Sequence, residues 1–268
     1  MARIGFTSTT FRALGTAALL LLTACASTSP SAVPSPPAEL ASLSGTAWVL
    51  ETLGGKPALE ATTVTARFAA DGTISGSSGC NRYSGPFSTS GNAIKVGDVA
   101  STMMACDDAI MAQEKSFLGA LTTASAFSVD DTTLTLSDRD GAALATLTWQ
   151  DQDLAGSSWI LTGYNNGKGA VVSVLTDSTA TLAFTEIGKV NGTGGCNRFM
   201  GGFQAEGSAL KISQLAGTKM ACVEPDGVMA QESAIMTALA STASFVLEGN
   251  MLTLKDASGA TAATLTRD

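Results

Sequence analysis

Histidine is absent from this chain of 268 residues. Its absence excludes Ser-His-Asp and Cys-His catalysis, histidine-ligated zinc and the usual general base near neutral pH. Positive charge is sparse as well, because 15 Lys and Arg stand against 23 Asp and Glu, for a formal net charge of −8. The basic residues form no cluster, and an acidic chain of this kind is a poor binder of nucleic acid. We therefore expect no nucleic-acid partner.

Nucleotide-binding glycine loops are absent too. The glycine-rich stretch at residues 192–195 lacks the Lys-Ser/Thr ending and the strand-to-helix context of a phosphate loop. We expect neither a cofactor nor a bound metal. An enzyme built on this sequence would have to work with carboxylates alone, so we expect a protein that is not an enzyme.

The N-terminus has the pattern of a bacterial export signal. Arg3 and Arg12 precede an apolar stretch at residues 13–22, which is too short to span a bilayer as a mature helix. The stretch ends in Leu-Thr-Ala-Cys at residues 22–25, which looks like a lipobox, in which the cysteine is acylated and becomes the first mature residue. The alternative is an ordinary signal peptide with an incidental cysteine. Cys25 is also the odd one of five cysteines, so lipidation would leave an even four.

These features predict a lipoprotein signal peptide at 1–24, followed by a tether. Residues 25–42 hold Cys25 and a segment rich in Ser, Pro and Ala without hydrophobic periodicity, as in a flexible linker. Ala26, rather than Asp, follows Cys25, which favours the outer membrane. We expect a protein anchored by lipid to the outer membrane of a bacterial envelope and facing the periplasm.

The rest of the chain consists of two copies of one domain. The segment GCNRYSGPF at residues 79–87 returns as GCNRFMGGF at residues 195–203. Each copy also has an upstream Trp, a later Met-Ala-Cys and a Gln-Glu pair; the corresponding residues are Trp48 and Trp159, Cys106 and Cys222, and Glu114 and Glu232. The period is far longer than a solenoid unit. We predict two tandem domains, at 43–150 and 154–268, joined by a short junction.

Most of each copy has the pattern of β-structure. β-Branched or alternating runs separated by Asp-Gly, Gly-Asn and Asp-Asp turns predict strands, in the first copy at 46–52, 63–68, 73–77, 93–96, 126–129, 133–137 and 142–149. After Cys106, capped by Asp107 or Asp108, a helical stripe contains Ile110, Glu114, Phe117, Leu118 and Leu121, and the second copy repeats the stripe after Asp226. The fold class is therefore α+β: two tandem domains, each a curved antiparallel sheet or partial barrel with one packed helix.

The joint motif resembles a known family. Gly-Cys-Asn-Arg-(Tyr/Phe), the later Met-Ala-Cys and the Gln-Glu helix with an upstream Trp are similar to the META domain, the family that includes the HslJ heat-shock lipoproteins. Both copies match, over nearly all of residues 43–268. The resemblance implies envelope proteins linked to stress or antibiotic tolerance, and it supplies no catalytic residues.

Four cysteines remain after Cys25 and allow three pairings. A module that once stood alone must have been self-sufficient, which favours Cys80–Cys106 and Cys196–Cys222. Closing a loop of this length would stabilise each domain by roughly 3 kcal/mol. The alternatives are buried reduced thiols, or a soft copper site that includes Met103, Met104 and Met111.

Two further pairs recur together. Glu114 and Glu232 lie in apolar helical stripes, where an unpaired carboxylate would be costly to bury. We predict structural ion pairs Arg82–Glu114 and Arg198–Glu232, with Asn81 and Asn197 bonding to nearby backbone. The alternative is a Glu with a raised pKa that acts as a general acid. We expect Trp48 and Trp159 in the cores, with sugar stacking as the alternative.

The sequence thus predicts a non-enzymatic outer-membrane lipoprotein with tandem META domains, acting in envelope maintenance or stress tolerance. One alternative is an inhibitor of a basic secreted enzyme such as lysozyme, which the acidic charge would suit. A second alternative is a carboxylate-based hydrolase. The expected contacts are the membrane, through the lipid anchor, and an envelope protein, for which a basic surface would fit.

Overall fold

The computed structural model describes residues 42–267. The predicted signal peptide at 1–24, Cys25 and the tether up to residue 41 lie outside the described residues, so they stay predictions. Between residues 42 and 267 no helix is both long enough and apolar enough to cross a membrane.

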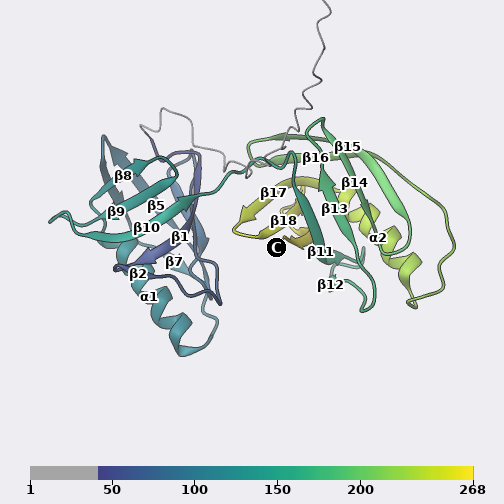
Figure 1. Cartoon of the computed structure of the whole chain (residues 1–268), viewed down its shortest axis with the longest axis horizontal. Helices are drawn as coiled ribbons and strands as arrows, with labels where there is room; N and C mark the ends of the chain where they lie inside the picture. Colours follow the sequence, from purple (N-terminus) through teal and green to yellow (C-terminus); the bar gives the residue numbers. More distant parts are fainter. Residues whose placement is uncertain (1–41, 268) are drawn as a thin grey trace, which may run out of the picture. The chain divides into compact units, whose positions relative to one another are not determined.

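The first half of the described chain forms a ten-stranded antiparallel sheet (Figure 1). Its strands are β1 (Thr46–Leu53), β2 (Lys56–Pro57), β3 (Thr65–Phe68), β4 (Thr73–Ser77), β5 (Arg82–Ser90), β6 (Ala93–Val96), β7 (Ala100–Ser101), β8 (Ala126–Asp130), β9 (Thr133–Ser137) and β10 (Ala143–Trp149). The order is β10-β9-β8-β6-β5-β4-β3-β1-β2, and β7 pairs with β5. Because β1 also pairs with β10, with Trp48 opposite Trp149, this sheet closes on itself.

The second half repeats this plan in nine strands. They are β11 (Ser158–Asn165), β12 (Val171–Ser173), β13 (Thr181–Phe184), β14 (Lys189–Thr193), β15 (Arg198–Glu206), β16 (Ala209–Gly217), β17 (Thr242–Glu248), β18 (Met251–Asp256) and β19 (Thr261–Thr266). The order is β12-β11-β13-β14-β15-β16-β17-β18-β19, and β11 also pairs with β19, with Leu161 opposite Leu265. The predicted pair of antiparallel, sheet-rich halves is confirmed.

Each sheet surrounds its own apolar core because side chains alternate along the strands. Leu134 and Leu136 of β9 are buried in the first core, and Leu252 and Leu254 of β18 in the second. Both upstream tryptophans are buried, as predicted. Their indole N–H groups stay satisfied: Trp48 donates to Thr46 Oγ1 at 2.6 Å, and Trp159 donates to Ser157 Oγ at 2.7 Å.

One helix lies in each half, α1 at Asp108–Thr123 and α2 at Val228–Ala240. The predicted stripe contributes Phe117 and Leu121 to the first core, and its counterpart contributes Ile235 and Leu239 to the second. Asp107 occupies the N-cap position of α1, one of the two predicted positions, but its side chain makes no capping hydrogen bond. The cap predicted at Asp226 is wrong, because Gly227, in the left-handed region, occupies the N-cap position of α2.

Candidate functional site

The repeated Gly-Cys-Asn motif forms the tight turn that leads into β5 in the first half and into β15 in the second. Gly79 and Gly195 have φ values of 110° and 122°, a region that favours glycine. The turn closes through a hydrogen bond from Ser78 N to the carbonyl oxygen of Asn81, 2.8 Å long. The motif therefore fixes the direction of the cysteine and asparagine side chains that follow the glycine.

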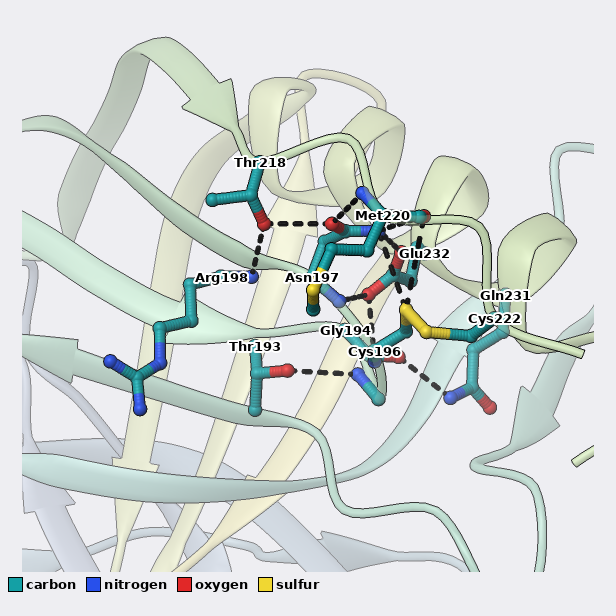
Figure 2. Close-up of a disulfide and its surroundings, with 11 residues drawn as sticks. Thr193, Gly194, Cys196, Asn197, Arg198, Thr218, Met220, Cys222, Gln231 and Glu232 are labelled. Atoms are coloured by element: carbon teal, nitrogen blue, oxygen red, sulfur yellow. Dashed lines mark hydrogen bonds between the residues drawn. A yellow bond between two sulfur atoms is a disulfide. The ribbon is translucent and has the colours of Figure 1, made fainter. Parts of the chain in front are cut away.

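The cysteine of each turn forms a disulfide with the cysteine that precedes the helix. Cys80 joins Cys106 with a Cα–Cα distance of 6.1 Å, and Cys196 joins Cys222 at 6.2 Å (Figure 2). Both Cα distances are within the usual range for disulfides. The predicted pairing within each repeat is confirmed, and it ties the segment before each helix to the motif turn.

The asparagine of the motif holds the same segment by its side-chain amide. In the first half Asn81 Oδ1 accepts from Met104 N at 2.7 Å and from Thr102 Oγ1 at 2.8 Å, while Nδ2 donates to Met104 O at 3.2 Å. Asn197 makes the same bonds with Met220 and Thr218 (Figure 2). The predicted bonding of these asparagines to nearby backbone is confirmed. Each amide bonds to both the N–H and the carbonyl group of one methionine, as the backbone of a neighbouring strand would.

The repeated glutamate accepts hydrogen bonds from the same turn. Glu114 is 6% exposed and accepts from Ser78 Oγ at 2.7 Å, from Asn81 N at 2.9 Å and from Asn81 Nδ2 at 2.9 Å. Glu232 accepts from Cys196 N at 2.8 Å, from Asn197 Nδ2 at 2.8 Å and from Asn197 N (Figure 2). Each buried carboxylate is therefore satisfied by neutral donors on one short turn.

The predicted ion pairs Arg82–Glu114 and Arg198–Glu232 are wrong. In the part of the chain that the structure describes, no ion pair joins either arginine to its expected glutamate. The reason is strand alternation: Arg82 and Arg198 begin β5 and β15 with exposed side chains, and the residues that follow them point inward. Figure 2 shows Arg198 extending away from Glu232.

The environment of Glu114 also decides between its structural and acid-base interpretations. Burial raises the pKa of Glu114, but the hydrogen bonds from Ser78, Asn81 and the Cys80 backbone outweigh it and leave the pKa below its ordinary value. A general acid near neutral pH needs the opposite shift. The alternative of a Glu114 with a raised pKa is therefore wrong.

The glutamine that precedes each glutamate fixes a second loop. Gln113 Oε1 accepts from Leu59 N at 2.8 Å, and its Nε2 donates to Thr62 Oγ1 at 3.2 Å. In the second half Gln231 Oε1 accepts from Leu175 N at 2.7 Å. Gln231 Nε2 also donates to Ser178 Oγ at 2.8 Å, so both glutamines hold corresponding loops in the same way. The sequence marks the Gln-Glu pair by repetition, but a backbone N–H partner leaves no mark of its own in the sequence.

The two halves of the chain match one protein family. The META domain profile matches residues 41–151 and again residues 152–268. The chain belongs to the META domain family. No curated protein matches it.

Solved structures are similar to part of this chain. An NMR structure of a protein from Burkholderia xenovorans is 28% identical and covers 43% of this chain and 83% of that one, with a TM-score of 0.35. A second NMR structure is 26% identical and covers 40% and 88%, with a TM-score of 0.33. A crystal structure of a DUF4847 family protein from Bacteroides vulgatus is 14% identical and covers 43% and 94%, with a TM-score of 0.32.

The two META domains differ at one position of the network. Ser78 of the first domain corresponds to Gly194 of the second, and a Cβ atom added to Gly194 would lie 2.8 Å from Glu232 Cγ. The second domain thus has no room for a serine hydroxyl. Glu232 therefore lacks the hydroxyl donor of Glu114 and accepts from the backbone N–H groups of Cys196 and Asn197 and from the Asn197 amide.

Neither META domain brings together a metal-binding set. Within residues 42–267 no group of three or more His, Cys, Asp or Glu side chains is placed to hold an ion. The two cysteines of each META domain form a disulfide, so neither domain offers a thiolate for the copper alternative. The arrangement at the motif is a set of cross-links: it joins a turn, a loop and a helix.

Proposed function

We propose that this chain is a non-enzymatic lipoprotein of the outer membrane that faces the periplasm and acts in envelope maintenance or stress tolerance. It would present two META domains, each an antiparallel sheet with one packed helix, at the end of a tether. The observation that carries the non-enzymatic part is the use of Glu114 and Glu232 as saturated acceptors of structural hydrogen bonds. The Leu-Thr-Ala-Cys sequence at residues 22–25 supports the anchor.

A carboxylate-based hydrolase is less well supported. A glycosidase needs two carboxylates that face one cleft, one of them with a raised pKa. Each repeat contributes a single motif acid, and in the first repeat its pKa is lowered. The lone pairs of that acid already serve the turn, so using it for catalysis would disrupt the fold.

An inhibitor of a basic secreted enzyme remains the second candidate, because the chain has a formal net charge of −8. Charge complementarity would speed the encounter with a cationic enzyme and make binding sensitive to salt. Titration of lysozyme against the protein at low and at moderate ionic strength tests this candidate. Inhibition that saturates at one inhibitor per enzyme would favour it over the envelope role.

The anchor is tested by Cys25→Ser. We expect this variant to leave the membrane fraction or to accumulate as an unprocessed precursor, because the acylated residue is gone. Normal mature size together with unchanged membrane fractionation would contradict the anchor.

The envelope role is tested by complementation of a deletion strain under envelope stress. Wild-type protein should restore tolerance, and Cys25→Ser at equal abundance should not. Glu232→Gln separates the enzymatic and structural interpretations: its rescue should follow the amount of folded protein. A folded Glu232→Gln protein at wild-type abundance that fails to rescue would favour catalysis.

A further inference from the structure

The second META domain has a groove that the proposed function does not use. Its volume is about 920 Å³, and it lies between α2 and the segment that runs from the end of β16 to the disulfide. Met229, Met236 and Thr237 line the groove from α2. Leu215, Lys219 and Met220 line it from the facing segment, and Phe199 of β15 completes the apolar lining. A volume of this order is typical of small-molecule sites.

The residues that line the groove expose large apolar side chains to solvent. Met220 is 57% exposed and Met229 is 43% exposed, although both belong to one groove that also contains half-buried Leu215 and Met236. Scattered exposed hydrophobic residues need no explanation, but a contiguous set around a concave surface marks a binding site. Methionines in particular form adaptable surfaces for flexible apolar ligands.

The charged groups at this groove are unusual for so acidic a chain. Arg198, Lys219 and Glu232 line it. The Glu232 carboxylate is 8% exposed and already accepts from two backbone N–H groups and the Asn197 amide. Arg198 and Lys219 are exposed, and within the described residues neither forms an ion pair. The charge that the groove offers a ligand is therefore positive.

The first domain supplies a natural comparison. Alignment on the cysteines and on the Gln-Glu pairs places Lys219 on Met103 and Ser233, a small residue that also lines the groove, on Lys115. Arg198 recurs in the first domain as Arg82, but the first domain carries an apolar residue in place of Lys219 and a long cationic side chain in place of Ser233. Lys219 and the small Ser233 therefore distinguish the groove of the second domain.

We propose that this groove binds a single-chain amphiphile with an anionic headgroup, its chain against the methionines of α2 and its headgroup near Arg198 and Lys219. Apolar burial along the groove would supply most of the binding free energy, and the two cations would select the headgroup. The site goes beyond the proposed envelope role and does not depend on the lipid anchor, since every residue in it lies in the folded second domain.

The test uses the full chain carrying Cys25→Ser, so that no acyl group of its own competes. Dansyl-undecanoate fluorescence reports binding, and oleate displaces it. We expect saturable binding below the critical micelle concentration. Ser233→Trp fills the groove from an exposed helix position and should weaken dansyl-undecanoate binding at least about tenfold. Lys115→Trp, the same change at the matched position of the first domain, should leave binding unchanged.

The headgroup assignment has its own pair of variants. Lys219→Glu places a like charge beside the anion and should weaken dansyl-undecanoate binding about tenfold. Lys211→Glu makes the same charge change on β16 outside the groove lining and should have no effect. Oleyl alcohol, which has the chain without the charge, should bind wild type less well than oleate. Its inhibition constant, corrected for the affinity of the probe, should be the same for wild type and Lys219→Glu.

Thermal unfolding of all four variants, within a few degrees of wild type, excludes misfolding as the cause. Equal binding by wild type and Ser233→Trp, or equal loss in Lys115→Trp, would overturn the site. Equal affinity for oleate and oleyl alcohol would overturn the anionic headgroup. If neither dansyl-undecanoate nor oleate shows saturable binding, while an apolar helical peptide does, the groove would be assigned to a protein partner and the proposal overturned.

Discussion

Asn81 donates two hydrogen bonds to Glu114, one from its backbone N–H and one from its side-chain amide, each 2.9 Å long. The same amide exchanges bonds with both backbone groups of Met104. One asparagine therefore links the helix that carries Glu114 to the loop that carries Met104. Because all of these donors are neutral, the carboxylate is stabilised without a cation, and the side chain of the neighbouring Arg82 takes no part in the network.

The first prediction concerns Glu114→Gln. The new amide would have to point its NH₂ at Ser78 and Asn81 N or at Asn81 Nδ2, and all three are donors. Asn81 cannot flip to help, because its Oδ1 accepts from Thr102 and Met104. We expect a loss of about 1–3 kcal/mol in the free energy of unfolding, measured in urea. Lys115→Gln, at the next and exposed position, is the control and should change stability little.

The second prediction concerns pH. The pKa of Glu114 in the folded protein is lower than in the unfolded chain, so its contribution to stability is fully present above the unfolded pKa, near about 4.3. That contribution is lost as the pH falls through the folded pKa. We expect unfolding free energies to fall on acidification from about pH 5 to about pH 3, and to fall less in Glu114→Gln. Exposed Glu60→Gln should keep the wild-type slope; an identical slope in Glu114→Gln would contradict the network.

The sequence predicts those strands and buried residues of this fold that its pattern of apolar side chains marks. Apolar alternation at Leu134 and Leu136 marks β9, and the predicted and observed strands agree there. Strand β5 went unpredicted because Gly85 and Pro86 interrupt the strand pattern, although both lie in paired positions. Burial of Glu114 was predicted from the helical stripe. Its partner was not, because backbone N–H donors occur at nearly every residue and leave no mark in the sequence.

The third prediction uses the difference between the two domains. Gly194→Ala would place a Cβ 2.8 Å from Glu232 Cγ and 3.0 Å from its Cα, so the helix or the turn must shift. We expect a loss of about 1–3 kcal/mol from this overpacking. Gly202→Ala is the matched control in the same domain, because its Cβ would meet nothing closer than 3.8 Å. Equal unfolding midpoints for the two variants would show that α2 is not held against the turn as described.

The fourth prediction separates two neighbours in the repeated motif. Asn197→Ala removes the amide that bonds Thr218, Met220 and Glu232, and leaves buried donors and acceptors without partners. We expect it to cost several times the roughly 1 kcal/mol of a single hydrogen bond. Arg198→Ala removes an exposed side chain and should change unfolding by less than about 0.5 kcal/mol.

Asn197→Ala and Arg198→Ala also distinguish an effect on stability from an effect on amphiphile binding. Because Arg198 lines the groove, Arg198→Ala should weaken dansyl-undecanoate binding while its unfolding curve stays with that of wild type. Urea unfolding and probe titration on the same preparations decide the matter. A large loss of stability in Arg198→Ala would instead support an ion pair between Arg198 and Glu232, since removal of this residue is costly only if its guanidinium is buried and paired. A small loss in Asn197→Ala would show that the loop before α2 is held by the disulfide alone.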